Sequence, residues 1–268
     1  MSTSIITNRI NKLKELLVEF GTVKNDIKSA ISNKLSVQAG EPVEAGRNMS
    51  YWVEFINSLE VSQYSDMAGM CYSFSTITEF PEGWKFAPRT ENHAEQMFSY
   101  CSYLTTIPQL DTSEAISFMN MFNFCPCLTT IPQLDTSKGT SFMYMFQDCY
   151  SLTTIPQLDT SKGISFGWMF SRCESLTTIP QLDTSKGRDF GSMFYDCAKL
   201  TTLGGFVGLG KNLDLSYSPN LTHDSLMNVI NNLATVTSST TLTLGSTNLA
   251  KLTDEEKKVA TDKGWTLA

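Results

Sequence analysis

A short sequence motif occurs four times between Leu104 and Lys199, and it constrains the possible fold of this chain more than any other feature. Each copy reads Leu-Thr-Thr-Ile-Pro-Gln-Leu-Asp-Thr-Ser, followed by a looser stretch and then Met-Phe-x-x-Cys. A fixed period of about 20 to 50 residues indicates stacked structural units that bury a shared core, so we expect a solenoid. The leucines that mark the period, 24 residues apart, are Leu104, Leu128, Leu152, Leu176 and Leu200.

Each copy predicts a short strand followed by a short helix. Leu128, Ile131 and Leu134 recur at every third residue, which gives an extended segment one inward side. The proline in this segment cannot donate a ladder hydrogen bond, so any parallel strand is short. The Asp-Thr-Ser that follows is typical of a turn whose aspartate caps the next helix. Apolar residues at helical spacing predict that helix: Phe142, Met145, Phe146 and Cys149.

Degenerate copies extend the array toward the N-terminus. The segment from Ile77 to Pro81 aligns with Leu-Thr-Thr-Ile-Pro, and the segment from Met97 to Cys101 aligns with Met-Phe-x-x-Cys. Met70-Cys71 fills the same place in a still earlier, partial copy. We therefore predict six units over residues 64–199, preceded by segments over 1–35 and 36–63 and followed by a C-terminal cap over 200–268.

Residues 1–35 contain a predicted amphipathic helix. A seven-residue apolar repeat supports a coiled coil, so this helix is expected to join copies of the chain or to attach it to another protein. Lys24 interrupts the apolar stripe. The alternative is a helix that packs on the protein's own repeats. The residues of the stripe are Ile6, Ile10, Leu13, Leu17, Phe20, Ile27 and Ile31.

The repeat array needs a capping element at each end, because its apolar cross-section would otherwise be exposed to water. Within 36–63, a linker containing glycine and proline is followed by Ser50, which reads as the N-cap of an aromatic amphipathic helix. We predict that this helix is the N-terminal cap. The predicted elements of the C-terminal cap are a helix that Thr222 begins and that runs through Leu233, a strand over 240–244, a capping box from Thr253 to Glu256, and a helix stop at Gly264.

Five of the seven cysteines fall at the repeat period. Each completes an apolar stripe, which places its thiol inward, where a free cysteine behaves as a small hydrophobic residue. We therefore predict buried, reduced thiols. Disulfides and a metal site are the alternatives, although zinc favours paired ligands, and Cys125 with Cys127 is the only close pair. The cysteines at the period are Cys101, Cys125, Cys149, Cys173 and Cys197.

The composition excludes several classes of function. The 268 residues carry a net charge of −7 with a pI near 4.9, and no Lys/Arg cluster occurs, so nucleic-acid binding is not expected. No run of about 18 apolar residues is present, so no membrane insertion is expected. The N-terminus lacks the profile of a signal peptide, so we expect the chain to be made in the cytoplasm and not secreted by the usual route.

No set of residues points to catalysis, to a cofactor or to a metal. The two histidines, His93 and His223, lie in no metal or triad motif, and no Walker, dinucleotide-fold or HExxH pattern occurs. A column of aspartates raises the question of calcium, but helix capping explains the same residues more simply. The members of this column are Asp111, Asp135, Asp159 and Asp183.

Positions at which the copies differ are the candidates for partner binding. Identical positions must fit the stack, whereas variable ones are free to face solvent or a partner, and an outward Tyr or Trp is a common interaction anchor. Ordinary surface residues are the alternative interpretation. Two positions of the predicted helix vary, with Asn120, Tyr144, Trp168 and Ser192 at one and Phe124, Asp148, Arg172 and Asp196 at the other. The candidates selected from them are Phe124, Tyr144, Trp168 and Arg172.

The repeats resemble a known family, the bacterial surface protein type of leucine-rich repeat, which is abundant in gut bacteria, mycoplasmas and their phages. The motif that carries the resemblance is Leu-Asp-Thr-Ser-Lys-Gly-x-Ser-Phe-x-x-Met-Phe-x-x-Cys-x-x-Leu-Thr-Thr-Ile-Pro, over residues 158–180. It implies a leucine-rich-repeat-like, right-handed α/β solenoid with a binding or adhesive function and no enzymatic activity. The segment from Ile27 to Ile56 is similar to segments near the start of phage tail-associated proteins.

The main functional hypothesis is a non-enzymatic phage virion protein, in which the repeats form a decoration, a fibre or a receptor-contact surface. The N-terminal helix would bind other virion proteins or further copies of the chain, giving a homo-oligomer, and the repeats would bind a host cell-surface protein or glycan. The alternative is a leucine-rich-repeat adhesin or protein-interaction module at the bacterial cell surface. An enzyme is the least supported class.

Overall fold

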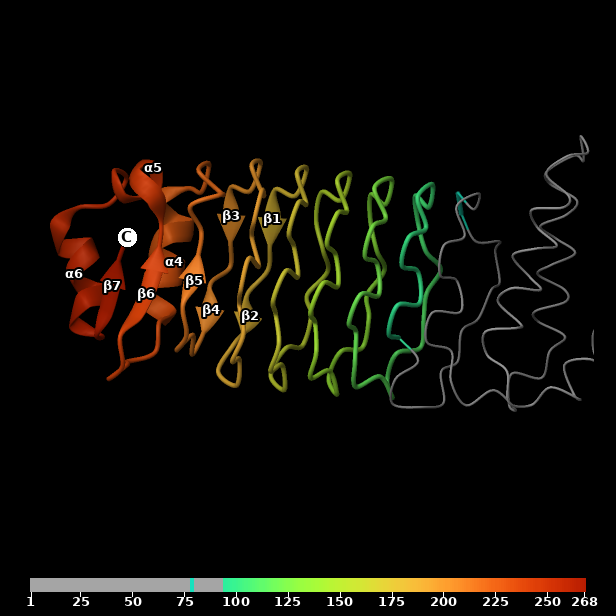
Figure 1. Cartoon of the computed structure of the whole chain (residues 1–268), viewed down its shortest axis with the longest axis horizontal. Coiled ribbons are helices and arrows are strands. Elements are labelled where there is room, and N and C mark those ends of the chain that lie inside the picture. The colour runs from blue at the N-terminus through green and yellow to red at the C-terminus, as the bar shows by residue number, and fades with distance from the viewer. Residues whose placement is uncertain (1–77, 80–93) are drawn as a thin grey trace, which may run out of the picture. The chain divides into compact units, whose positions relative to one another are not determined.

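The computed structural model describes residues 78–79 and 94–268, all of which belong to the second of two units of the chain, Ser62–Ala268. Figure 1 shows residues 94–268 as a row of coils stacked side by side, which ends in a helical C-terminal part. The helix predicted from Ile6 to Ile31, the cap predicted over 36–63 and the earliest repeats lie outside the described residues.

Backbone hydrogen bonds join each coil to the next. In the Leu-Thr-Thr part of the motif, N–H groups donate to the C=O of the preceding coil, as from Thr129 to Thr105 at 3.1 Å. In the Met-Phe part they donate to the following coil, as from Asn120 to Met143 at 3.0 Å. β1 pairs with β3 and β2 with β4, all in parallel, as expected for leucine-rich-repeat-like units. These strands are β1 Thr178–Ile179, β2 Leu182–Asp183, β3 Thr202–Leu203 and β4 Phe206–Val207.

The interior of the stack consists of columns of identical side chains. Two columns of phenylalanine run through it, and within each repeat column the ring centroids of neighbouring coils lie 5.3–5.7 Å apart. The leucines and methionines of the motif form further buried columns. The predicted inward side of the extended segment is confirmed, except that Ile131 is only half-buried. The two columns are Phe118, Phe142, Phe166 and Phe190, and Phe98, Phe122, Phe146, Phe170 and Phe194.

The short helix predicted for each unit is wrong. In the described repeats the Phe-x-x-Met-Phe-x-x-Cys segment is a series of tight turns. Met145 N–H donates to the C=O of Phe142 three residues earlier, and Phe146 N–H donates across to Met169 of the next coil at 2.9 Å. Residues with positive φ, such as Tyr144 at 58°, make this path possible. Alternate N–H groups are therefore bonded between coils instead of within a helix.

The repeat cysteines form another buried column, and they are free thiols as predicted. The Cys149 thiol donates to the C=O of Phe122 at 3.1 Å, and the same contact recurs in neighbouring coils. Burial raises the pKa of the Cys149 and Cys197 thiols to about 12. Thiolates are the reactive form of cysteine, so these buried thiols are expected to be inert at neutral pH.

We expect thiol reagents to distinguish Cys127, which is half-buried, from the five buried thiols of the column. In a Cys71→Ser variant, Ellman's reagent should modify Cys127 rapidly at mildly alkaline pH and the column only after unfolding in guanidinium. Cys127→Ser is the control, because Ser151 and Ser175 stand at the matching positions, and it should abolish the rapid phase. Rapid modification of a second thiol in the folded Cys71→Ser variant would contradict the buried column.

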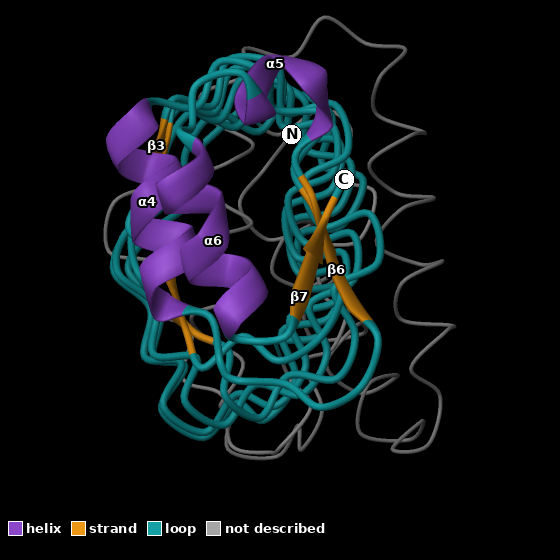
Figure 2. Cartoon of the chain, turned by 90° about the vertical axis from the view of Figure 1, so that its left-hand side faces the viewer, coloured by secondary structure: helices purple, strands orange, loops and turns teal. Residues whose placement is uncertain are grey.

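The C-terminal part continues the ladder of coils and adds helices to it. β5 pairs with β6 and β6 with β7, all in parallel. Figure 2 shows α4 and α6 on one side of this part and β6 and β7 on the other. No helix in the described ranges is long and apolar enough to cross a membrane. The elements are β5 Leu213–Asp214, α4 His223–Asn232, β6 Thr240–Thr243, α5 Gly245–Leu249, α6 Asp254–Asp262 and β7 Trp265–Leu267.

The sequence signals of this C-terminal part are confirmed. Thr222 accepts a hydrogen bond from the N–H of Ser225 at the start of α4. Thr253 and Glu256 form the predicted capping box of α6, and Gly264 has φ of 87° just after that helix. The helix α5 and the strand β7 were not predicted, because elements of five and three residues are too short to show a period.

Candidate functional site

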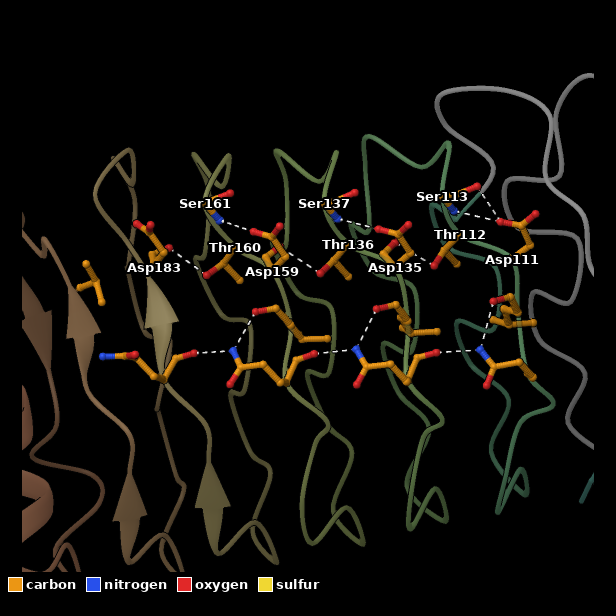
Figure 3. A pocket seen from close by; sticks show the side chains of 18 residues that line it. Asp111, Thr112, Ser113, Asp135, Thr136, Ser137, Asp159, Thr160, Ser161 and Asp183 are labelled. Carbon is orange, nitrogen blue, oxygen red and sulfur yellow. Dashed lines mark hydrogen bonds between the residues drawn. The ribbon is translucent and has the colours of Figure 1, made fainter.

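A shallow groove of about 860 Å³ runs along the coils, on the side formed by the Gln-Leu-Asp-Thr-Ser part of the motif (Figure 3). Its lining includes the buried leucines Leu134 and Leu158, together with polar side chains that recur once per coil. The groove therefore presents the same chemical groups several times in a row.

The aspartate column lines this groove, but it caps no helix. Oδ1 of Asp135 accepts a hydrogen bond from the N–H of Ser137 at 3.0 Å, and every aspartate of the column makes the same contact. Thr136 Oγ1 donates to the C=O of Asp159 in the next coil at 2.9 Å. The capping prediction is wrong because no helix follows. The aspartates instead close turns, which their short acceptor side chains favour.

Hydrogen bonds lower the pKa of two aspartates of the column. The side-chain hydrogen bond from Ser137 lowers the pKa of Asp135, and Ser161 lowers the pKa of Asp159 in the same way. In the part of the chain that the structure describes, no group of three or more His, Cys, Asp and Glu side chains could hold a metal ion. The row of carboxylates therefore offers one ligand per coil, without the clustering that calcium coordination requires.

A ladder of glutamines runs along the same groove. Nε2 of Gln133 donates to the C=O of Gln157 at 2.7 Å and to the C=O of Leu134 at 3.0 Å. Gln109 and Gln157 make the equivalent pairs of contacts. Since the amide nitrogens donate within the stack, the groups left for a ligand in this groove are mainly acceptor oxygens.

His223 has a structural role in the C-terminal part. Its Nε2 lies 2.8 Å from Oε1 of Glu256, which joins α4 to α6. The hydrogen bond to Glu256 raises the pKa of the imidazole. Because Glu256 also completes the capping box, this pair is explained by the packing of two helices.

The candidate partner-binding residues all have positive φ. The angle is 58° at Tyr144 and 59° at Phe124, Trp168 and Arg172. L-residues other than Asn, Asp and Gly rarely adopt this conformation, which costs roughly 1 kcal/mol or more for a bulky side chain. Phe124 and Trp168 are nonetheless more than a third exposed. The large side chains of Phe124 and Trp168 are therefore explained neither by the backbone nor by burial in the core.

Tyr144 and Trp168 begin a row of ring contacts that we call the aromatic strip, which continues through Tyr195 to Tyr217. Successive centroids lie 6.2, 6.4 and 4.6 Å apart, with interplanar angles of 30°, 46° and 52°. Tyr144 is half-buried and the other three rings are more exposed. Sequence reasoning missed Tyr195 because it stands three residues after the variable position, and Tyr217 because the period has ended there.

The other two candidates lie outside the aromatic strip. The ring of Phe124 stacks on Tyr100 with centroids 5.2 Å apart. Arg172 forms an ion pair with Asp148 at 2.9 Å and lies over the ring of Tyr150. Asp148, expected at a solvent-facing position, is instead buried and accepts a hydrogen bond from the Tyr150 hydroxyl. An internal network therefore accounts for Arg172.

Comparison with known proteins identifies a family. Residues 47–128 and 92–204 match the family described as "Mycoplasma protein of unknown function, DUF285". The crystal structure of the T. pallidum leucine-rich repeat protein TpLRR is similar at 20% identity and a TM-score of 0.45, over 71% of this chain and 84% of that chain. No curated protein matches the sequence.

These findings bear on both predicted resemblances. The similarity of the motif to mycoplasma repeat proteins is confirmed at the level of the family. The similarity of the N-terminal segment to phage tail-associated proteins gains no support. The two matched regions together span 47–204, more than half of the chain, and the protein therefore belongs to the DUF285 family.

Proposed function

We propose that the protein is a non-enzymatic binding module whose repeats present variable side chains to a protein partner. One contrast carries this proposal. The Leu, Phe, Met and Cys columns hardly change from copy to copy, while one position of positive φ changes from Asn120 to Tyr144, Trp168 and Ser192. Bulky residues in an unfavourable backbone conformation lower the stability of the fold, and such residues are typical of functional surfaces. Exposed Tyr and Trp are also common anchors of interfaces.

The module in this proposal is a right-handed solenoid of six units at the bacterial cell surface. Membership of a family described from Mycoplasma supports a surface or interaction module better than a virion protein. The virion role also depends on attachment or self-association through the helix predicted over 1–35, which lies outside the described residues. That narrower role stays a prediction, and mass spectrometry of purified phage particles tests it.

Site-specific cross-linking tests the binding function. A photo-reactive benzoylphenylalanine replaces Ser192 in the full chain, produced in the organism that encodes it. Ser192 holds the position of Trp168 in the next coil, so this replacement keeps all four rings of the aromatic strip. The control carries the same group in place of Tyr103, which is 59% exposed and lies outside the aromatic strip. We expect a protein partner to be captured from position 192 and not from position 103. Equal capture from both positions, or none from position 192, would argue against this function.

A further inference from the structure

We propose that the groove on the Gln-Leu-Asp-Thr-Ser side binds a linear polyamine, a chain of ammonium groups joined by short methylene spacers. The variable positions of the proposed function are not part of this groove, so the proposal does not depend on them. Three properties of the groove support it: the sign of its charges, the hydrogen-bonding groups that it leaves open, and the distance at which both repeat along the stack.

The ionisable side chains of the groove are all of one kind. Aspartates line it, whereas Lys, Arg and His are absent from the lining that the described coils form. The lysines three residues after Asp135 and Asp159 lie outside this lining, and Lys138 is paired there with Glu114 at 2.7 Å. A groove lined by charges of one sign concentrates counter-ions, so its ligand is a cation. The aspartates of the lining are Asp111, Asp135, Asp159 and Asp183.

In three consecutive coils, the side-chain donors of the groove are already used within the stack. The amides of Gln109, Gln133 and Gln157 each donate to two carbonyl groups. The threonine hydroxyls of these coils donate to the aspartate C=O of the next coil. Within the described ranges no donor reaches Oε1 of these glutamines, and both bonds from Ser185 to Asp183 go to Oδ1 alone. Amide and carboxylate oxygens are therefore the groups open to a ligand.

This set of open groups matches a polyamine better than a peptide or a sugar. Peptides and sugars carry oxygens that accept hydrogen bonds, and the groove has few donors to replace the water that these oxygens would lose. An ammonium group is a donor only, so acceptors alone satisfy it. The methylene spacers are apolar and match the buried leucines that line the groove, much as lysine stems cover apolar surface.

The charges of a polyamine and the coils of the stack repeat at similar distances. Neighbouring coils lie about 4.8 Å apart where their backbones pair, and equivalent phenylalanine rings lie 5.3–5.7 Å apart. With bond lengths of about 1.5 Å, amines joined by three or four methylenes lie about 5–6 Å apart in an extended chain. Successive ammonium groups therefore reach the aspartates of successive coils. A divalent metal ion instead needs several carboxylates around one point, and the described coils contain no such group.

Isothermal titration calorimetry of the full chain with spermine, a linear tetraamine, tests this proposal. At low ionic strength we expect saturable binding of spermine, and about tenfold weaker binding of the diamine putrescine, which reaches fewer coils. Mg²⁺ and tetralysine at the same concentration of charge should both bind more weakly than spermine. The metal ion finds no cluster of ligands, and the peptide brings carbonyl groups for which the groove has few donors.

The double variant Asp135→Asn with Asp159→Asn should weaken the binding of spermine about tenfold. Asparagine keeps the turn, because its amide oxygen also accepts the N–H two residues further on. The matched control, Glu174→Gln with Glu255→Gln, removes the same charge from exposed positions outside the lining and should change binding by about twofold or less. If the aspartate double variant melts below the native chain, Asp159→Asn alone replaces it, with an expected loss of about threefold.

Absence of spermine binding by the native chain, equal binding of Mg²⁺ or tetralysine, or an equal loss in the two double variants would each overturn the polyamine assignment. Spermine binding that the aspartate variants leave intact would do the same. None of these results affects cross-linking from position 192, which tests the protein partner independently.

Discussion

Replacing Phe146 by alanine should lower the free energy of unfolding by about 3–5 kcal/mol. The ring has no exposed surface and lies between Phe122 and Phe170, with centroids 5.5 and 5.7 Å away. Alanine removes the apolar contacts with both rings and leaves a cavity. The coil is hydrogen-bonded to its neighbours, as through the 2.9 Å bond from Phe146 N–H to Met169, so the cavity cannot collapse without breaking the ladder.

Guanidinium unfolding followed by far-ultraviolet circular dichroism measures this loss. The matched control is Ile164→Thr, which replaces a side chain that is 43% exposed by the residue found at Thr140. Surface substitutions of this kind change stability by about 0.5 kcal/mol or less. A loss below about 1 kcal/mol for Phe146→Ala would mean that the phenylalanine column does not support the stack.

Gly204→Ala should destabilise the protein by about 3 kcal/mol, because it places an atom inside the backbone of the preceding coil. A Cβ at this position would lie 2.3 Å from the nitrogen of Gln181 and 2.8 Å from the carbonyl carbon of Pro180. A side chain could rotate away, but a paired backbone cannot. The two coils would have to separate there, at the expense of the 2.9 Å hydrogen bond from Gly204 N–H to Ile179.

Gly210→Ala is the control, because the nearest atom to its Cβ is 3.8 Å away, in Ala234. Gly163→Ala should fall between the two. Its Cβ meets a side chain, the ring of Phe166, and Ala115 occupies the matching position of the first full copy. Thermal unfolding of the three variants should rank them in this order. Equal melting temperatures for Gly204→Ala and Gly210→Ala would show that the coils separate at that point without cost.

The core was predictable from the sequence because it repeats. Leucine, phenylalanine and cysteine at a fixed spacing could only share an interior if successive copies stacked, and the structure places each of them in a buried column. The elements of the C-terminal part were predictable for a different reason. Thr222, Thr253 and Glu256 satisfy backbone groups at the starts of helices, which is a local and general requirement.

The helix of each unit was predicted wrongly because a helix and a series of tight turns can place apolar residues at the same spacing along the sequence. Apolar residues at Phe142, Met145, Phe146 and Cys149 fit a helix, but they also fit a pair of turns that repeats every four residues. A local signal was the presence of Asn120, Asp148 and Asp196 at the positions of positive φ, where these two residue types are favoured. Tyr144, Trp168, Phe124 and Arg172 at the equivalent positions concealed it.

The aromatic strip was half predictable. Variation between copies identified Tyr144 and Trp168, because those positions repeat and can be compared. Tyr217 has no counterpart in the repeats, and its contact with Tyr195, at 4.6 Å between centroids, depends on how the last coils pack. Arg172 was selected by the same reasoning as Trp168, but its ion pair with the buried Asp148 turns it to an internal role that no comparison of copies could show.

The bonding of each coil to the one 23 or 24 residues away has an evolutionary consequence. Since neighbouring copies offer interchangeable partners, a recombination event that deletes or duplicates one whole copy rejoins every donor with an equivalent acceptor. The protein can therefore gain or lose whole coils while the core keeps the same columns of side chains. Each such event also changes which aromatic residues follow one another along the outside, so under the proposed function a change in gene length would also change the binding surface.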